Sequence, residues 1–408
     1  MLRLASWQAT LVLAALVAMG PLATDLYLPA LPAIARDLGA GADQVQLTLS
    51  VYLIGFAVAQ LVYGPVADRF GRKPVLFFGI SLFILASIGC AYTESIEAMI
   101  ALRFLQALGG CAGPVLGRAA VRDIHTPLEA ARVLSYLGTA MALAPAVAPT
   151  IGGFLLVAFG WPSAFVAMAI YAIIIGAILI IAIPEPLAPE LRQSIHPFAI
   201  LRNYSILLRS REFLGYTLTN AAVFAGLFAF LSGSSFVLIE FLGVPEAQFG
   251  FYFALIPVSY MTGTLIAGRL SRELGVNRLL VAGTSCTAGG GLLIAALAVA
   301  HVYHVAAVLG PMMLFMVGVG IVMPQTLAGA VGPFPHMAGS ASALYGFTQM
   351  TTASLVGAGV GHFHEGTSLS MAAGIGAMGI ASLALFFTLV WLPMRVQSNA
   401  AVAPGDDG

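Results

Sequence analysis

The chain consists largely of apolar stretches, each close to the length that a helix needs to cross a bilayer, about 20 residues. Six of them lie at residues 7–29, 44–65, 74–93, 96–117, 132–158 and 162–183. After a longer polar segment from Pro184 to Arg211, six more lie at residues 213–239, 247–270, 277–299, 304–327, 337–361 and 368–392. The sequence therefore predicts an all-α integral membrane protein with twelve transmembrane helices.

The composition excludes a water-soluble fold. Hydrophobic residues make up 60% of the chain and charged residues only 8%, whereas a soluble domain carries roughly 25% charged residues. Basic and acidic residues balance at 17 each, so the overall charge gives no reason to expect a nucleic acid partner. The surroundings that this composition fits are the lipid bilayer.

The basic residues gather on one side of the predicted spans. Fifteen of the seventeen fall in alternate loops or near the ends of the chain. Of the other two, Arg36 lies in an opposite-side loop and Arg103 lies deep within span 4. Positively charged loops stay in the cytoplasm. Both ends of the chain and the central polar segment are therefore predicted to be cytoplasmic.

The two halves of the chain repeat one pattern. Gly64 and Gly71 after span 2 correspond to Gly268 and Gly275 after span 8, at a constant offset of 204 residues. The repeat indicates a duplicated six-helix unit, and hence two pseudo-symmetric six-helix bundles. We predict an N-terminal bundle at residues 1–184, a cytoplasmic linker at 185–211, a C-terminal bundle at 212–395 and a disordered tail at 396–408.

Two ionisable residues lie deep within the predicted bilayer, Asp25 in span 1 and Arg103 in span 4. A charge at the bilayer centre costs at least about 2.5 to 3.5 kcal/mol on insertion scales, so such residues usually face a cavity or a partner and mark an ion path. Asp25 could carry a proton, form a structural pair, or lie at an interfacial position near the outer end of its span. Arg103 could be the movable counter-charge of that site, or a fixed tie between helices that bonds backbone carbonyls.

Further motifs flank these two residues. Span 4 carries Gln106 on the same face as Arg103, and span 5 carries two prolines and small residues that allow a bent, closely packed helix. The loop after span 2 has glycines for a tight turn and an acid followed by bases, which could either gate the cytoplasmic side or only set the topology. The span 5 residues are Pro145, Pro149, Gly152 and Gly153, and the loop residues are Gly64, Asp68, Arg69, Gly71 and Arg72.

Aromatic and amide residues within the spans could line an apolar cavity with a few polar contacts, although each alone is also an ordinary packing residue. With the two charged residues and Gln106, they form the predicted substrate-binding set. The added residues are Tyr27, Tyr52, Asn220, Phe224, Phe228, Tyr345 and Gln349.

Other chemistries lack their sequence signals. The three cysteines show no ligand spacing, the histidines near 301 and 362 lie in short loop pieces, and a Walker A sequence does not occur. We therefore expect no metal, no cofactor other than the coupling proton, and no enzymatic activity; a membrane-embedded enzyme is the more distant rival.

These motifs resemble the major facilitator superfamily over residues 5 to 395, and within it the drug:proton antiporters with twelve spans. The loop at residues 64–73, the segment Arg103 to Gly110 and the segment Pro145 to Gly153 are similar to the signature, proton-coupling and antiporter motifs of that group. Residues 24–32, 46–50 and 121–123 look like the bicyclomycin/chloramphenicol (Bcr/CflA) resistance exporters. One departure is Ala148-Pro149, where the antiporter motif commonly has Gly-Pro.

The resemblance implies that Asp25 and Arg103 take part in proton coupling and drug recognition. It implies export of small amphipathic compounds such as phenicols or bicyclomycin across the inner (plasma) membrane of a bacterium, by a monomer whose two bundles rock around a central site. The rival within the same fold is a proton-coupled symporter or facilitator that imports a small nutrient. Neither the identity of the drugs nor the proton stoichiometry follows from the sequence.

Overall fold

A computed structural model describes residues 7–182, 184–187, 197–364 and 366–393, and within these ranges the chain contains helices and no strands. The first half contains α1 (Trp7–Asp25), η1 (Leu28–Ala30), α2 (Leu31–Asp37), α3 (Ala42–Phe70), α4 (Arg72–Ala91), α5 (Ile96–Gly110), α6 (Ala112–Ile124), α7 (Pro127–Phe159) and α8 (Pro162–Ala182). The second half contains α9 (Pro197–Arg209), α10 (Arg211–Ser235), η3 (Phe236–Phe241), α11 (Glu246–Phe253), α12 (Leu255–Val299), α13 (Val305–Val331), η4 (Pro335–Met337), α14 (Ala338–His362), α15 (Leu369–Phe386) and η5 (Phe387–Trp391).

These helices make the twelve predicted crossings. Ten segments of the described chain are long and apolar enough to span a membrane. One of them, Glu246–Val299, runs for 54 residues and turns at Gly275, so it supplies two crossings. Helix α14 supplies the twelfth; it is rich in Gly, Ser and Thr, which suits a helix packed against other helices better than one facing lipid.

The turn at Gly275 matches its predicted counterpart in the first half. Gly71 has φ 94° and ψ 155°, and Gly275 has φ 72° and ψ 165°. Both glycines therefore adopt a left-handed, extended conformation that side chains with a Cβ rarely take. The repeat in the sequence thus corresponds to one backbone turn used twice, after α3 and within the long α12.

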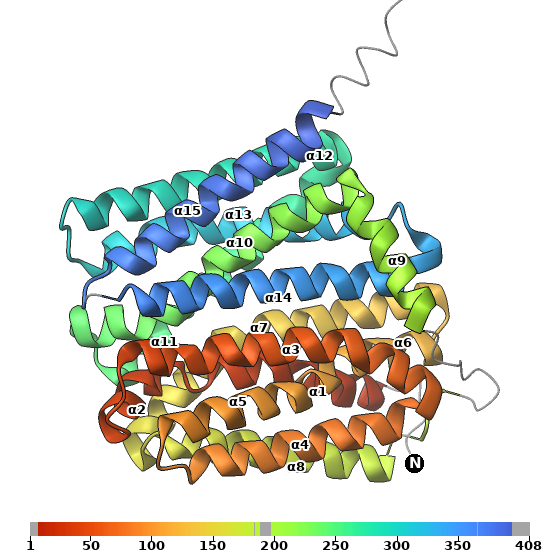
Figure 1. The fold of residues 1–408 in the computed structure, drawn as a ribbon, viewed down its shortest axis with the longest axis horizontal. Coiled ribbons are helices and arrows are strands. Elements are labelled where there is room, and N and C mark those ends of the chain that lie inside the picture. Colours follow the sequence, from red (N-terminus) through yellow and green to blue (C-terminus); the bar gives the residue numbers. More distant parts are fainter. Residues whose placement is uncertain (1–6, 183, 188–196, 365, 394–408) are drawn as a thin grey trace, which may run out of the picture.

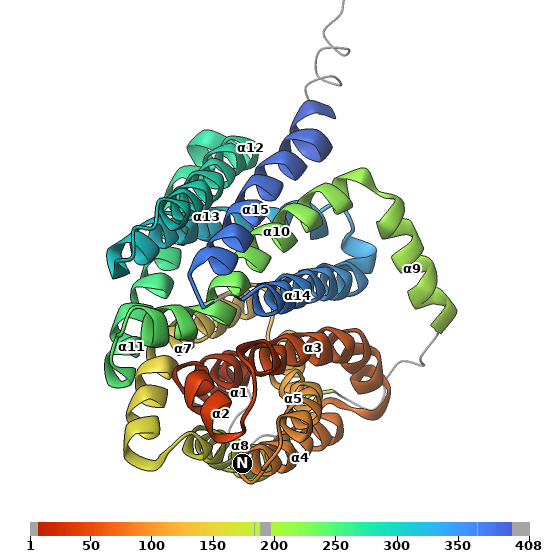
Figure 2. The same ribbon diagram turned by 60° about the vertical axis from the view of Figure 1, so that its left-hand side comes forward.

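The helices of each half pack side by side, and the halves meet along two seams (Figures 1 and 2). Helix α3 lies against α14, and α7 lies against α11. The α7–α11 seam depends on glycine, because a Cβ at Gly250 of α11 would collide with the backbone of Thr150. In the α3–α14 seam, a Cβ at Gly346 of α14 would meet only the end of the Gln60 side chain. Small residues allow helices in a membrane to approach closely, and here they join the two halves.

Several polar contacts join the halves at the outer ends of these helices. Ser235 Oγ donates to the carbonyl of Leu28 at 2.6 Å, and Ser232 Oγ donates to Gln46 Oε1 at 3.0 Å. On the outer surface, Arg36 forms ion pairs with Glu246 at 3.2 Å and Glu240 at 3.6 Å. The outer side of the protein is therefore closed in this structure.

His364 lies beside this closure, with its ring 5.6 Å from that of Phe236. Partial burial lowers the pKa of His364 below its usual value, and the nearby Glu240 carboxylate opposes that shift. At neutral pH the imidazole therefore stays uncharged and leaves Arg36 as the cation that faces Glu240 and Glu246.

The predicted linker, residues 185–211, contains a helix that the apolar pattern did not predict, α9. The predicted disordered tail at 396–408 lies outside the described residues. The bundle limits at 1–184 and 212–395 stay predictions.

Replacing Arg36 with alanine removes both ion pairs that cross the outer surface, and we expect the outer side to open more often. In a variant whose native cysteines are replaced, Ser232→Cys should react faster with a membrane-impermeant maleimide added outside the cell. Because exposed ion pairs contribute about 0.2 to 1 kcal/mol, the rate should rise by up to about fivefold.

Arg36→Lys should restore most of the protection, and Arg278→Ala on the cytoplasmic side should leave the labelling rate unchanged. An equal rise for Arg36→Ala and Arg278→Ala would show that the ion pairs do not hold the outer side closed.

Candidate functional site

Asp25 lies where the first span is interrupted. Pro29 and Pro32 lack the amide hydrogens that would continue the helix, so α1 ends at Asp25 and the chain resumes as η1 and α2. The side chain of Asp25 is 3% exposed, and its Oδ1 atom has no hydrogen-bond partner. The interruption thus leaves one carboxyl oxygen of Asp25 without a partner inside the protein, at a helix end whose last carbonyls have no partners within the helix.

Arg103 of α5 occupies this break. Its Nη1 atom donates to the carbonyl of Ala23 at 3.1 Å and also to Gln106 Oε1. The guanidinium carbon lies 4.2 Å from the ring centroid of Tyr27 and 4.4 Å from that of Tyr52. A cation is stabilised both by the C-terminal end of a helix and by aromatic faces, so this fully buried arginine ties α5 to the broken end of α1.

Polar side chains fix the positions of Gln106 and Tyr27, the neighbours of Arg103. Gln106 Nε2 donates to Ser87 Oγ at 2.7 Å, and Ser87 Oγ donates to the carbonyl of Phe83 at 2.6 Å. The hydroxyl of Tyr27 lies 3.2 Å from Thr48 Oγ1. The sequence analysis named Tyr27 and Gln106 but not Ser87 or Thr48, although a polar residue within an otherwise apolar span is a usable signal.

Asp25 and Arg103 do not form an ion pair within 4.0 Å in the described structure. Nε and Nη2 of Arg103 and the hydroxyl of Tyr52 also lack hydrogen-bond partners. Gly110 makes room for that hydroxyl, since a Cβ there would lie 2.6 Å from it. The described site therefore keeps one acceptor, Oδ1 of Asp25, and several donors of Arg103 and Tyr52 without partners.

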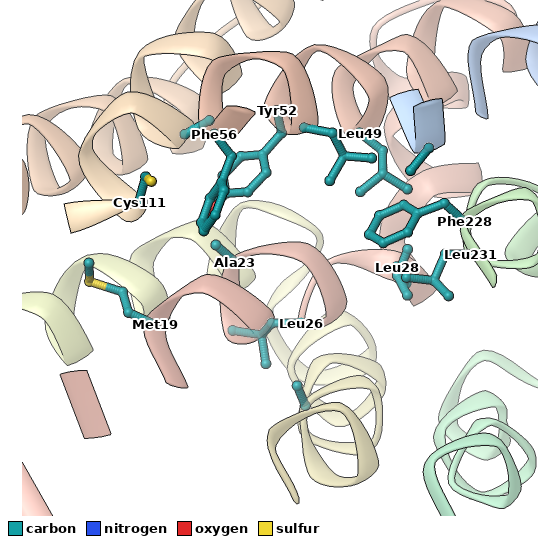
Figure 3. Packing of buried hydrophobic residues seen from close by; sticks show 14 of the residues in the cluster. Met19, Ala23, Leu26, Leu28, Leu49, Tyr52, Phe56, Cys111, Phe228 and Leu231 are labelled. Carbon is teal, nitrogen blue, oxygen red and sulfur yellow. The ribbon is translucent and has the colours of Figure 1, made fainter. Parts of the chain in front are cut away.

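The second half brings aromatic side chains toward this region. Phe228 of α10 points toward Leu28 and Leu49 of the first half (Figure 3), and its ring centroid lies 4.8 Å from that of Phe224. Asn220, two turns earlier, is completely buried, and neither atom of its amide has a partner. Phe228 thus connects the predicted α10 residues to the break in α1.

The predicted residues of α14 are placed differently. The Tyr345 hydroxyl bonds Thr326 of α13 at 3.0 Å, so it is used within the second half. Gln349 is 8% exposed one turn further along α14. No described contact joins either residue to Arg103, and their role in binding stays a prediction.

The span 5 motif supports the site from behind. Pro145 and Pro149 lie within α7. A Cβ at Gly152 would collide with the carbonyl of Leu26, and one at Gly153 would lie 2.8 Å from the carbonyl of Glu246. Gly152 therefore lets α7 contact the break in α1, and Gly153 lets α7 contact α11 of the other half.

The loop after α3 forms a brace within the first half. Arg72 pairs with Asp68 at 2.6 Å and with Asp123 of α6 at 2.8 Å. Glu185 accepts from the backbone amides of Arg72 at 2.8 Å and Lys73 at 2.9 Å. These contacts link α3, α4, α6 and the segment after α8.

The other loop residues differ in their contacts. The Arg69 guanidinium lies 5.3 Å from the ring of its neighbour Phe70, and a Cβ at Gly64 would meet no atom within 4 Å. The described bonds of this loop thus stay within the first half, and its role as a gate stays a prediction.

Helices of the structure extend past the predicted span ends and include charged residues that the sequence analysis assigned to loops. Span 4 does not end near residue 117, because α6 continues to Ile124 and includes Arg118. The Nε atom of Arg118 donates to the carbonyl of Pro114 at 2.8 Å, a bond within its own helix. The apolar window ended too early because arginine lowers local hydropathy even where a helix continues.

In the described part of the chain, no three His, Cys, Asp or Glu side chains are grouped as a metal site requires.

The profile of the Major Facilitator Superfamily matches residues 11–358. The chain belongs to this superfamily. It is 30% identical over 380 residues to a bicyclomycin resistance protein homolog of Haemophilus influenzae, covering 93% of this chain and 95% of that protein. It is 33% identical over 333 residues to a chloramphenicol resistance protein of Pseudomonas aeruginosa, covering 80% and 77%. The resemblance drawn from the motifs is confirmed, and with it a multi-pass protein of the bacterial inner membrane.

A solved structure confirms the fold of this superfamily member. The xylose transporter XylE of Escherichia coli, in a partially occluded inward-open conformation, superimposes with a TM-score of 0.73 over 93% of this chain and 97% of that chain. The two sequences are 14% identical, so this likeness concerns the fold alone.

Gly152→Val should push α7 away from the break in α1, because its side chain has no room beside the Leu26 carbonyl. Overpacking of this kind costs about 1 to 3 kcal/mol. We expect a lower unfolding temperature for the purified protein in detergent. Gly138→Val is the matched control in the same helix, since a Cβ at Gly138 meets nothing within 4 Å. Equal losses for the two variants would contradict the close approach at Gly152.

Proposed function

We propose that this transporter exports small amphipathic drug-like compounds from the cytoplasm in exchange for protons. The observation that carries the proposal is the buried Asp25 carboxyl group with an unbonded oxygen, two residues after Ala23, whose carbonyl binds an arginine with unused donors. Both lie at an interruption of a spanning helix, where membrane transporters commonly place their ion and substrate sites.

The arrangement suits a site that alternates between two occupants. A protonated carboxyl group is neutral and can stay buried alone, whereas a buried carboxylate needs a cation or hydrogen-bond donors nearby. Arg103 or a substrate bearing donors could meet that need. Loss of the proton from Asp25 would then accompany substrate binding, and protonation from the outside would accompany substrate release.

The relatives and the span 5 motif support the direction and the kind of substrate. Two relatives are named for resistance to bicyclomycin and chloramphenicol, so bicyclomycin and phenicols are the first compounds to test. The aromatic pair Phe224 and Phe228 and the rings of Tyr27 and Tyr52 would contact the apolar part of such compounds. We further propose that a single chain suffices, since each half contributes to the site.

Asp25→Asn should abolish proton-driven accumulation of drug by inverted membrane vesicles, because an amide cannot release a proton. The variant should still reach the membrane in normal amounts. Asp43→Asn, which changes an exposed carboxylate of the same half, should accumulate drug as the wild type does. Wild-type accumulation by Asp25→Asn would refute the proposed proton site.

The same vesicles separate export from import. Acidifying the interior of inverted vesicles drives an exporter to accumulate the drug inside, whereas a proton-coupled importer would move its substrate outward. Movement of the drug out of the vesicles under these conditions would contradict the proposal and indicate a proton-coupled symporter.

Arg103→Ala should move drug-triggered proton release from purified protein to higher pH, because the cation that favours the charged carboxylate is gone. Arg103→Lys should restore the midpoint only in part, since lysine keeps the charge but loses the planar fork that bonds Ala23 and Gln106 together. If Arg103 acts only as a helix tie, both variants should unfold at lower temperature while the midpoint of proton release stays unchanged.

A further inference from the structure

Helix α9 presents one face to the protein and the opposite face outward. Leu207 is completely buried, and Asn203 and Tyr204 are half-buried beside it. Asn203 Nδ2 donates to Ser340 Oγ of α14 at 3.4 Å. At 100° per residue these side chains share one side of the helix. Contacts with the protein therefore fix the orientation of α9 and determine which side chains point away.

The position of α9 places it at the cytoplasmic surface of the membrane. It ends at Arg209, two residues before the spanning helix α10 begins at Arg211. Its partner Ser340 lies in the first turn of α14. Figure 1 shows α9 running steeply across the ends of α10 and α14 rather than alongside them. With 13 residues it is about 20 Å long, too short to span the bilayer, and it lies along the membrane plane.

The outward side combines apolar and basic residues. Phe198 is 88% exposed, Leu201 63% and Leu208 51%. Arg202 and Arg209, also exposed, lie two turns apart on the neighbouring edge of the same side. A short helix with a large apolar edge beside a basic edge is the pattern of helices that rest in a membrane interface.

We infer that α9 is a lipid-binding helix that rests on the inner leaflet, with Phe198, Leu201 and Leu208 among the acyl chains and the two arginines on anionic phospholipid headgroups. Charge complementarity selects this occupant, because the cytoplasmic leaflet carries the anionic lipids and arginine pairs with phosphate. The membrane surface also lies close to α9, because the spanning helix α10 begins two residues after α9 ends.

This placement would fix the depth of α9, which connects the two halves, relative to the lipid headgroups. Helix α9 is bonded to α14 and continues into α10, both of the second half. The lipid contact would therefore hold the inner ends of these helices at the level of the headgroups while the first half moves relative to them.

The test measures the depth of α9 in the full-length protein. Trp7, Trp161 and Trp391 are replaced by phenylalanine, Phe198→Trp is introduced, and the protein is reconstituted in vesicles of phosphatidylcholine and phosphatidylglycerol. Lipids brominated on the acyl chain should quench this tryptophan, and aqueous iodide should not. Phe78→Trp in the exposed side of α4 is the control for lipid contact, and Phe363→Trp in the outer loop is the control for water.

Quenching of Phe198→Trp by brominated lipid at a level close to that of Phe78→Trp supports the inference. Quenching by iodide alone, as expected for Phe363→Trp, overturns it. Protection from both quenchers would mean that protein covers the face, and would overturn it as well. If the tryptophan-free protein does not fold, Phe198→Cys with an environment-sensitive fluorophore, in a background without native cysteines, gives the same comparison.

The arginines provide a second, independent readout. Each basic residue at an anionic surface should raise the ratio of docked to undocked helix about fivefold. Phosphatidylglycerol should therefore increase lipid quenching in the wild-type background, and Arg202→Gln with Arg209→Gln should remove this increase. The matched pair Arg272→Gln with Arg278→Gln should keep it. Equal dependence on phosphatidylglycerol in both double variants would overturn the headgroup contact. None of these measurements requires drug transport, so their failure would leave the proposed export function untouched.

Discussion

The interruption of the first span, closed by Arg103, is the feature on which the rest of the site depends. Proline ends α1 within the first span, and the last carbonyls of a helix have no partners within that helix. In a bilayer such groups must be satisfied within the protein. Arg103 satisfies one of them at Ala23, and two tyrosine rings cover its charge. Asp25 lies at the same break, so the carbonyl that Arg103 binds and the proposed proton-binding carboxyl group belong to one short segment of the chain.

The neighbouring helices are shaped by this requirement. Glycine at 152 lets α7 approach the break, and glycine at 110 leaves space for Tyr52. On the cytoplasmic side, Arg72 braces the first half. Its guanidinium pairs with Asp68 and Asp123, and its backbone amide donates to Glu185. A half that is internally braced can move as one body. The described contacts that join it to the second half are the closely packed helix seams, apolar contacts such as that of Phe228, and several polar bonds.

The membrane explains why so much of the fold could be predicted. Each crossing requires a long apolar segment, and basic loops fix the orientation, so the twelve spans follow from local composition. The prediction was wrong at the end of span 4, where Arg118 continues α6, and it missed α9 within the linker. In both places a helix is stabilised by contacts with other helices, as Leu207 shows for α9, and local hydropathy carries no record of such contacts.

The sequence alone determined the fold class, the orientation, the repeated glycine turn and the two residues, Asp25 and Arg103, whose burial needs an explanation. Each of these follows from the cost of placing polar or charged groups in hydrocarbon. Only the tertiary structure decided that Arg103 binds the Ala23 carbonyl rather than Asp25, that Phe228 rather than Tyr345 meets the other half's core, and that the Arg72 brace stays within one half. These outcomes depend on how the helices are rotated and paired, which is set by contacts between residues far apart in the chain.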